Sequence, residues 1–310
     1  MRVSVVANPR AGSGAAARKL DALRRGLSEL GIAHEVLTTE RRGHASELAR
    51  QARDAGSSVL LVVGGDGTLN EVSQAYIDTD GQPIPGPAIG IVPAGTGGDF
   101  ARGTNQTRAD IPSVLARLSA LELQPLDLGV LSLTSASGAP VYRAFLNITS
   151  MGISGDVDER VERGPKWLGG KAAFLWGTFG AALGYQNVPI ELSIDGEVWH
   201  RGPLFVAAIA NGQFLGGGMH IAPRADVSDG QFDVVVVGDI SKAKLAALLS
   251  TVYRGAHLGL DCVKSQRGRV VSARAMRDEK PVLVDVDGET PGYLPLTARI
   301  FPGALRLLVD

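Results

Sequence analysis

Three short turns rich in glycine follow three apolar, strand-like segments in the first third of the chain. They are Asn8-Pro9-Arg10-Ala11-Gly12, Gly65-Asp66-Gly67-Thr68-Leu69-Asn70-Glu71, and the turn from Pro93 to Arg102, which contains Thr96. Glycine leaves backbone N–H groups uncovered, so such turns can point several of them at phosphate oxygens. A helix that begins directly after a turn adds the positive end of its dipole. The pattern indicates a site for a phosphorylated ligand.

Asp66 lies inside the second turn, where a carboxylate would repel a bare phosphate group. A divalent cation between the two removes that repulsion, so Asp66 indicates a complex of a metal ion with a nucleotide. The alternative is a plain strand-to-helix turn in which Asp66 only caps a helix, because Gly and Asp are ordinary turn formers. The ends of parallel strands meet at one edge of a sheet, so three such turns favour one shared site.

The segments that position these turns alternate between strand and helix up to about Pro125. This alternation predicts a parallel sheet with helices on its faces. Strands are expected at 3–7, 33–37, 59–63 and 88–92, and helices at 15–30, 43–55, 69–77 and 111–121. After Pro125, segments rich in Val, Ile and Phe predict an antiparallel β-sandwich with helical insertions near 153–183 and 242–258. We therefore predict an α/β nucleotide-binding domain over residues 1–125 and a β-rich domain over 126–299.

Composition narrows the classes of function. A chain of 310 residues is long enough for two domains, and its net charge of −1 gives no electrostatic case for nucleic-acid binding. Cys262 is the only cysteine, which excludes a disulfide framework and fits a reducing cytosol. The chain enters a strand directly after Met1, and its most apolar stretch, 167–183, is shorter than the ~20 residues of a membrane span. We expect a cytoplasmic protein without a transmembrane segment.

The chain resembles the diacylglycerol kinase catalytic family, which also contains sphingosine and ceramide kinases and bacterial soluble lipid kinases. The turn with Asp66 is shared with NAD kinases, but its combination with the turn at 93–102, the segment 211–233 and Asp287-Gly288-Glu289 is more specific. No Walker sequence occurs in the chain. The resemblance implies a nucleotide domain like that of NAD and diacylglycerol kinases, then a β-rich domain, with the final strand at about 300–310 returning to the first domain.

The resemblance also implies site residues for a kinase that uses ATP and Mg²⁺. Asp287 would be the general base that accepts the proton of a lipid hydroxyl, and Glu289 would orient it or hold a metal-bound water. Asp229 would bind a structural Mg²⁺ with the carbonyl oxygens of Val227 and Gln231, and Asp66 would face the Mg²⁺ of the nucleotide. The implied ATP contacts are Asn8, Pro9, Arg10, Ala11, Gly12, Thr39, Gly65, Asp66, Gly67, Thr68, Leu69, Asn70, Glu71 and Thr96.

Asp287 also has a plain structural interpretation, as part of an Asp-Gly hairpin turn. Asp195-Gly196-Glu197 repeats the same tripeptide between two strand-like segments, where a simple hairpin is expected. Because side chains alternate along a strand, Asp285 and Asp287 are expected on one face of the segment 282–289, a strand that ends in an acidic turn. Gly98 departs from the family pattern, which usually has asparagine there, and this departure bears on how the substrate is placed.

The lipid-binding side is less specified. The aromatic and basic residues Trp167, Phe174, Leu175, Trp176 and Phe179, with Lys166 and Lys171, either form a shelf at the membrane interface or pack in a core. We predict a cytoplasmic kinase, peripheral at the membrane, that converts diacylglycerol to phosphatidic acid, and a homodimer is possible. The alternatives are a sphingoid-base or ceramide kinase, an NAD kinase, and a catalytically silent nucleotide or lipid sensor.

Overall fold

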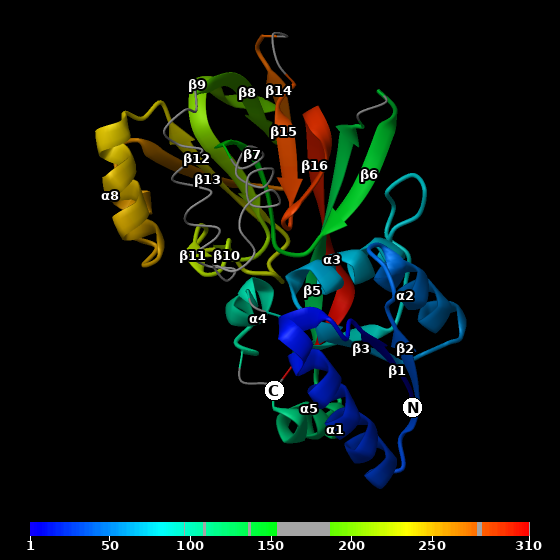
Figure 1. Cartoon of the computed structure of the whole chain (residues 1–310). Helices are drawn as coiled ribbons and strands as arrows, with labels where there is room; N and C mark the ends of the chain where they lie inside the picture. The colour runs from blue at the N-terminus through cyan, green and yellow to red at the C-terminus, as the bar shows by residue number, and fades with distance from the viewer. Residues whose placement is uncertain (96, 108–109, 136–137, 154–186, 278–280, 310) are drawn as a thin grey trace. The chain divides into compact units, whose positions relative to one another are not determined.

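The computed structural model describes residues 1–95, 97–107, 110–135, 138–153, 187–277 and 281–309. The chain divides into two compact units (Figure 1). Unit 1 consists of Met1–Leu128 and Phe301–Asp310, and unit 2 consists of Gly129–Ile300. The chain therefore passes from one unit to the other within strand β5 (Leu123–Thr134) and returns at the end of strand β16 (Glu289–Leu308).

Unit 1 contains a parallel sheet in the order β4-β3-β1-β2. Its strands are β1 (Arg2–Ala7), β2 (Ala33–Thr38), β3 (Val59–Gly64) and β4 (Ala88–Pro93). The sequence of β3, Val-Leu-Leu-Val-Val-Gly, is buried at every position, as in parallel strands that are covered on both faces. The end of β16 lies parallel to β4 through the pair Leu307 and Ile89.

Helices cover this sheet and close its core. They are α1 (Ala15–Glu29), α2 (His44–Asp54), α3 (Asp66–Ser73), α4 (Asp99–Gly103) and α5 (Ile111–Ala120), with 3₁₀ turns η1 (Ala11–Gly14) and η2 (Gln74–Tyr76). Leu23 and Leu27 of α1 pack with Leu118 of α5 against the strands. α1 and α5 approach closely, because a Cβ atom on Gly26 would lie 2.2 Å from Leu115. The carboxylate of Asp110 accepts the Ser113 amide and caps α5.

Unit 2 is antiparallel throughout its described strand pairs. Besides parts of β5 and β16, its strands are β6 (Pro140–Phe145), β7 (Ile148–Gly152), β8 (Val188–Ile194), β9 (Glu197–Ala210), β12 (Phe232–Gly238), β13 (Val263–Gly268), β14 (Val270–Ala275) and β15 (Leu283–Val286). They pair in the order β13-β12-β9-β7-β15-β16, with β14 between β8 and β16. Phe145 and Phe232 stack in the core, with ring centroids 5.5 Å apart.

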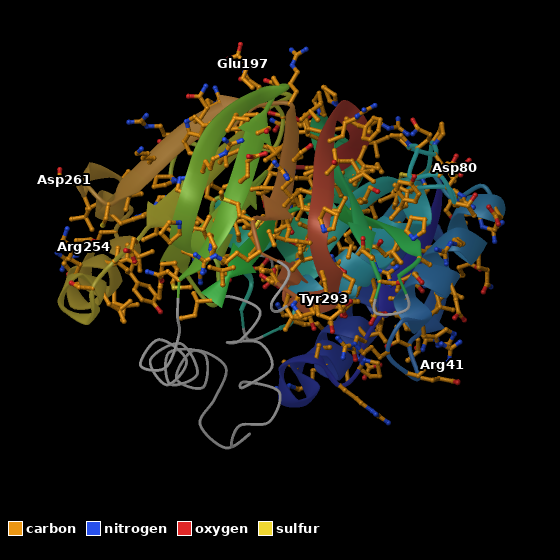
Figure 2. The ribbon with its side chains drawn as sticks, turned by 90° about the horizontal axis from the view of Figure 1, so that it is seen from above. Arg41, Asp80, Glu197, Arg254, Asp261 and Tyr293 are labelled. Carbon is orange, nitrogen blue, oxygen red and sulfur yellow. The ribbon has the colours of Figure 1, made fainter. Side chains whose placement is uncertain are left out.

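Smaller elements complete unit 2. β10 (Phe214–Leu215) and β11 (Met219–His220) form a short hairpin. Helix α8 (Lys242–Val252) and the 3₁₀ turn η4 (Ala256–Gly259) pack over a second apolar cluster of this unit. Charged side chains such as Arg41 and Asp80 in unit 1 and Glu197 and Asp261 in unit 2 are exposed (Figure 2). In the part of the chain that the structure describes, no helix is long and apolar enough to cross a bilayer.

Several expected elements differ from the observed ones. The apolar segment 141–149 reads as one strand in the sequence, but it breaks at Leu146 and Asn147 into β6 and β7. β13 was not expected, because its middle residues are polar and exposed. β16 begins far before the predicted final strand, since its prolines and glycines resemble turn signals in the sequence. The helical insertion expected near 153–183 lies, except for Ile153, outside the described residues.

A buried polar pair holds the C-terminal strand in unit 1, and its removal should lower stability. The Arg117 guanidinium donates to Oε1 of Gln106 at 2.6 Å, and Nε2 of Gln106 donates to the Leu308 carbonyl of β16. Gln106→Ala removes an acceptor from a buried charge, so we expect the free energy of unfolding to fall by about 2 kcal/mol or more. Urea denaturation measures this change.

Gln124→Ala is the matched control, because Gln124 is exposed on β5. This variant should stay within about 0.5 kcal/mol of the parent chain. Equal unfolding midpoints for Gln106→Ala and the parent chain would contradict the proposed role of this pair.

Candidate active site

The first and second glycine-rich turns are joined through Asn8. Its backbone amide donates to the Val63 carbonyl at 2.9 Å, and its side-chain amide donates to Oγ1 of Thr68 at 3.4 Å. The side-chain oxygen of Asn8 accepts the Arg10 amide at 3.1 Å, and its carbonyl accepts the Ala11 amide at 3.1 Å. Asn8 therefore shapes the first turn, and the amides of Arg10 and Ala11 are used inside it.

Close backbone contacts bring the third turn against the other two. A Cβ atom on Gly12, whose φ is +58°, would lie 2.0 Å from the carbonyl oxygen of Ala94. A Cβ atom on Gly95 would lie 2.5 Å from the Cα atom of Gly65. The structure thus brings all three turns together at one end of the parallel sheet, and it does so through contacts that only glycine permits.

Asp66 connects the second and third turns through its carboxylate. Oδ2 accepts the amide of Asp99 at 3.1 Å, and Oδ1 accepts the amide of Phe100 at 3.2 Å. Asp66 is the first residue of α3, but its carboxylate caps the start of α4. Each carboxylate oxygen can accept more than one bond, so this capping leaves acceptor capacity for a metal ion or water.

The remaining expected ATP contacts have different surroundings. Glu71 accepts the amide of Ala45 at 3.0 Å and so caps α2. Thr39 follows β2, and its amide donates to the Ala7 carbonyl at 2.8 Å. Leu69 and Asn70 are buried within unit 1. Thr96 lies outside the described residues.

Glycine at position 98 departs from the family pattern without changing the backbone conformation. Its φ is +64°, in the left-handed region that glycine and, less readily, asparagine adopt. Gly98 therefore keeps the conformation that asparagine would take and lacks only the side-chain amide. The next residue, Asp99, is buried and forms an ion pair with Arg102 at 2.5 Å.

Lys19 is a candidate functional residue that the sequence analysis missed. Its ammonium group donates to the carbonyl of Pro93 at 2.5 Å, which places a positive charge beside the third turn. Burial lowers the pKa of Lys19 from the ordinary lysine value, and the charge of Asp110 opposes that shift. Lys19 follows Arg18 in an Ala-rich helix, and nothing in its spacing separated it from a solvated helix residue.

In unit 2, Asp287 lies in a hairpin turn directly after β15. Its φ is +50° and that of Gly288 is +87°, as in the tight turns that connect adjacent antiparallel strands. Oδ1 accepts the Ile148 amide at 2.8 Å, and Oδ2 accepts the Leu146 amide at 3.1 Å. β15 ends at Val286, so Asp287 lies in the turn and not in the strand. The alternation of strand side chains therefore does not apply to Asp285 and Asp287 together, and it does not support the shared face that was expected.

Asp285 holds the same turn from inside the sheet. It is buried, and its carboxylate accepts the Ser150 hydroxyl at 2.9 Å and the Gly288 amide at 2.8 Å. The Thr149 hydroxyl donates to its carbonyl oxygen at 2.7 Å. Asp285 therefore positions the turn that carries Asp287, a role that the sequence pattern did not reveal.

The second Asp-Gly-Glu tripeptide adopts the same backbone conformation. Asp195 has a φ of +50°, and one of its oxygens accepts the amides of Arg269 and Val270 at 2.9 and 2.8 Å. Turn geometry alone therefore does not distinguish Asp287 from Asp195. Their surroundings differ. The two oxygens of Asp287 accept the amides of the residues before and after Asn147. Asn147 is itself buried, and its side chain donates to the Phe214 carbonyl at 2.6 Å.

The expected metal residue Asp229 is paired with a cationic side chain. Its carboxylate accepts the Gln231 amide at 3.0 Å and forms an ion pair with Arg267, which also contacts Asp233 at 3.3 Å. Burial raises the pKa of Asp233, and the charge of Arg267 opposes this shift. Among the described residues, no three His, Cys, Asp or Glu side chains gather around a possible metal position. A metal ion on Asp229 would have to compete with Arg267.

The aromatic shelf expected at Trp167, Phe174, Leu175, Trp176 and Phe179, with Lys166 and Lys171, lies outside the described residues.

Comparison with known proteins places these features in a family. Residues 2–131 match the family described as "Diacylglycerol kinase catalytic domain", and residues 147–309 match "YegS C-terminal NAD kinase beta sandwich-like domain". The chain is 28% identical to a diacylglycerol kinase of Mycobacterium tuberculosis, over 99% of this chain and 94% of the relative. It is 32% identical to a "Probable lipid kinase YegS-like" of Xanthomonas euvesicatoria, over 91% and 88% of the two chains.

Solved structures show the same fold. A diacylglycerol kinase structure from Bacillus anthracis matches with a TM-score of 0.70 at 18% identity, covering 100% of this chain and 97% of the other. An NAD kinase from Archaeoglobus fulgidus, solved in complex with ATP, matches with a TM-score of 0.53 at 14% identity, covering 99% and 93%. The three joined turns of unit 1 and the Asp-Gly-Glu turn of unit 2 thus belong to a lipid kinase of the diacylglycerol kinase catalytic family.

Proposed function

We propose that this protein transfers the γ-phosphoryl group of ATP to a hydroxyl of a membrane lipid, with diacylglycerol as the acceptor and phosphatidic acid as the product. The observation that carries the proposal is the joining of three glycine-rich turns in unit 1, with the Asp66 carboxylate bridging two of them. Membership of a lipid kinase family supports the transfer reaction and the lipid acceptor.

Unit 1 supplies the nucleotide site in this proposal. The turns at 8–12, 65–71 and 93–102 would hold the phosphate groups. A Cβ atom on Gly67 or Gly98 would meet no atom within 4 Å, so the backbone at these two glycines is open to a ligand. The Asp66 carboxylate keeps lone pairs beyond its bonds to the Asp99 and Phe100 amides, so it fits a magnesium ion carried by ATP. Bound Mg²⁺ would neutralise charge that develops on the phosphate oxygens. Lys19 adds a positive charge beside the third turn.

Unit 2 supplies the base. Two backbone amides fix the carboxylate of Asp287, so its orientation is set before a substrate arrives. Each oxygen retains capacity to accept a proton or hydrogen bond from a lipid hydroxyl. Glu289 pairs with Val286 across the turn, close in sequence to Asp287, where it could orient the acceptor. The protein would work in the cytoplasm and meet its substrate at the membrane surface.

Transfer of label from γ-labelled ATP tests the reaction class directly. The purified protein is incubated with Mg²⁺ and mixed micelles of diacylglycerol, sphingosine or ceramide, and separately with NAD. We expect labelled phosphatidic acid. Label in a different lipid would support lipid kinase activity with that lipid as the acceptor. Label in NAD alone would show that the protein is an NAD kinase and refute the lipid kinase proposal. ATP binding without any labelled product would favour a silent sensor.

Asp287→Asn should separate catalysis from turn formation. We expect kcat to fall about a hundredfold or more, because the amide cannot accept the substrate proton, while ATP affinity stays unchanged. Asp195→Asn is the control for an Asp-Gly turn with the same φ. Asparagine can keep both amide bonds of Asp195, which share one oxygen, but loses one of the two at Asp287, so the thermal melt reports that structural part of the effect. Steady-state kinetics and a thermal melt of both variants measure the two effects. Equal activity of Asp287→Asn and Asp195→Asn would refute the base.

Asp66→Asn tests whether Asp66 serves a metal ion as well as a helix cap. We expect ATP affinity in Mg²⁺ to fall about tenfold, to the level measured in EDTA, because an amide is a poor ligand for this ion. Calorimetric titration with and without Mg²⁺ measures the effect. Asp78→Asn removes a carboxylate that accepts the amides of Asp80 and Gln82 in an exposed turn of unit 1, and it should affect stability only. If Asp66→Asn is merely destabilised by about 1 kcal/mol and keeps Mg²⁺-dependent binding, Asp66 is a cap alone.

Arg267 should keep Mg²⁺ out of the site that the family resemblance implies at Asp229, Val227 and Gln231. Because Arg267 pairs with Asp229, we expect Mg²⁺ to leave the melting temperature of the nucleotide-free protein unchanged. In Arg267→Met the carboxylate is released, and millimolar Mg²⁺ should raise the melting temperature by about 2 °C or more. Arg274→Met, which breaks an ion pair with Glu191 on the same unit, is the control. If Mg²⁺ changed the melting temperatures of the parent protein, Arg267→Met and Arg274→Met by the same amount, Arg267 would not compete with Mg²⁺.

A further inference from the structure

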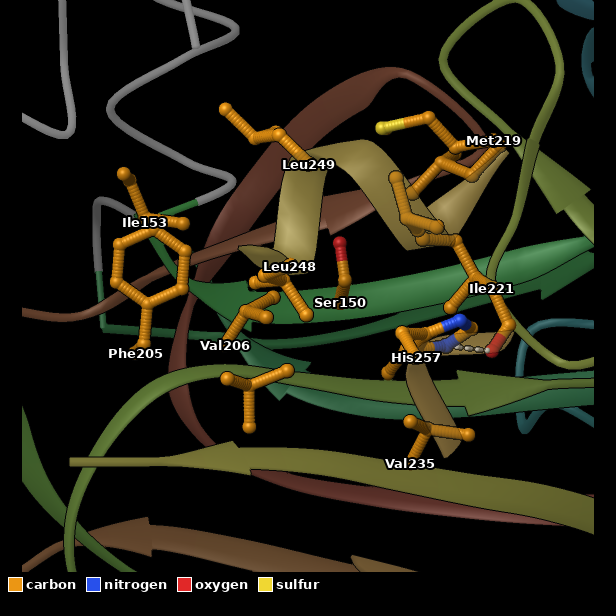
Figure 3. Close-up of a pocket in the computed structure, with 14 residues that line it drawn as sticks. Ser150, Ile153, Phe205, Val206, Met219, Ile221, Val235, Leu248, Leu249 and His257 are labelled. Atoms are coloured by element: carbon orange, nitrogen blue, oxygen red, sulfur yellow. Dashed lines mark hydrogen bonds between the residues drawn. The ribbon is translucent and has the colours of Figure 1, made fainter. Parts of the chain in front are cut away.

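Unit 2 contains an apolar cavity between its sheet and helix α8 (Figure 3). Its volume is about 90 Å³, enough for several water molecules or a short run of methylene groups. Aliphatic and aromatic side chains form most of its wall, among them Ile153, Phe205, Val235, Leu248 and Leu249. Such a wall favours hydrocarbon over water. Helix α8 packs on this side of the sheet, and its residues Leu245 and Leu248 are buried in the apolar cluster.

His257 is a polar exception in the cavity wall. It belongs to η4, and its side chain is buried, with 1% of the residue exposed. Nε2 lies 3.0 Å from the carbonyl oxygen of Ile221, as the dashed line in Figure 3 shows. A carbonyl only accepts hydrogen bonds, so Nε2 carries the hydrogen atom. Nδ1 has no hydrogen-bond partner among the residues that the structure describes.

The protonation state of His257 decides what Nδ1 can bind. Burial lowers the pKa of His257, the bond to Ile221 opposes this shift, and the nearby His220 ring adds to the lowering. The ring is therefore neutral near pH 7. With the hydrogen atom on Nε2, Nδ1 carries a lone pair and can only accept a hydrogen bond.

The position of the His257 ring is fixed by its neighbours. Gly255 enters η4 with a φ of +69°, and a Cβ atom there would lie 2.6 Å from Pro223 and 3.1 Å from Nδ1 of His220. The chain before His257 therefore packs tightly against the segment that carries Ile221. The ring cannot turn to another partner without breaking its bond to the Ile221 carbonyl.

Ser150 provides a second acceptor at the same cavity. Its hydroxyl donates to the buried carboxylate of Asp285 at 2.9 Å, so the hydrogen atom is used and the lone pairs of Oγ remain. Both polar side chains that line the cavity are thus acceptors. A ligand that satisfies either one must bring a hydrogen-bond donor into apolar surroundings.

We propose that this cavity binds part of a hydrocarbon chain that carries a hydroxyl group, in the lipid substrate, and that Nδ1 of His257 accepts a hydrogen bond from that hydroxyl. The inference rests on the proposed function, because it takes the ligand to be the lipid substrate. An ester carbonyl has no hydrogen to donate and would leave Nδ1 unpaired. His257 therefore acts as a specificity residue that favours a diacylglycerol with a hydroxylated chain over one with an unsubstituted chain.

Binding of chemically matched chains tests this inference without relying on catalysis. Methyl hexadecanoate and its hydroxylated forms, with the hydroxyl moved along the chain, compete for the protein with fluorescent cis-parinaric acid. We expect one hydroxyl position to bind about tenfold tighter than the unsubstituted ester, the effect of one well-placed hydrogen bond. His257→Phe keeps the apolar volume and should abolish that preference, while His257→Gln, which keeps an acceptor oxygen, should retain part of it.

Three results would overturn the proposal. One is the absence of a preference at every hydroxyl position in the parent protein, which would mean that Nδ1 meets only water. Another is failure of the chains to displace the probe, and the third is an unchanged preference in His257→Phe at an unchanged melting temperature. The label-transfer assay is separate: loss of all lipid labelling with intact hydroxyl preference would refute the kinase proposal and leave the binding site standing.

Discussion

Bonds between carboxylates and backbone amides hold together the turns on which the candidate site depends. Asp66 accepts two amides at the start of α4, Glu71 accepts one at the start of α2, and Asp287 accepts two between β6 and β7. Such bonds are stronger than bonds between neutral groups, and they also complement the positive ends of helices. The turns are rich in glycine and have few side chains of their own, so these carboxylates supply much of their rigidity.

This arrangement explains why the same residues support a structural and a chemical interpretation. A carboxylate that accepts two amides has a fixed orientation but still has lone pairs to offer a metal ion or a proton. Fixing a reactive group before the substrate binds is what an active site requires. Asp195 shows the structural role alone, because it holds a hairpin with the same φ through its bonds to the Arg269 and Val270 amides. The capping bonds are therefore compatible with catalysis and are not evidence for it.

The sequence predicted unit 1 well because its signals are local. Apolar strands followed directly by glycine turns placed β1, β3 and β4 within one residue of their observed ends. The features of unit 2 that the sequence did not predict, such as the separation of β6 from β7, depend on contacts between residues far apart in the chain. β6 and β7 separate at Leu146 and Asn147, where Asp287 and Asn211 draw the backbone out of the strand.

Charge pairing across the sheet was equally invisible in the sequence. Arg267 lies on β13, a strand that the sequence did not predict, and it forms an ion pair with Asp229. Without knowledge of this pair, the oxygen ligands around Asp229 indicated a metal site. The spacing of histidines in the sequence suggests no ligand set, so the sequence does not mark His257 as functional. Only the fold shows which of its two nitrogens is already used.

Buried polar groups in unit 2 differ in whether the protein itself satisfies them. Glu191, Asp233 and Asp285 are buried carboxylates, and each finds arginine, hydroxyl or amide partners within the sheet. Nδ1 of His257 and Oδ1 of Asn147 are buried acceptors that find none among the described residues. An unpaired buried acceptor costs about 1–3 kcal/mol, and an apolar side chain would avoid that cost. A ligand that brings a hydrogen-bond donor, as a hydroxyl-bearing lipid does, would remove that cost at His257.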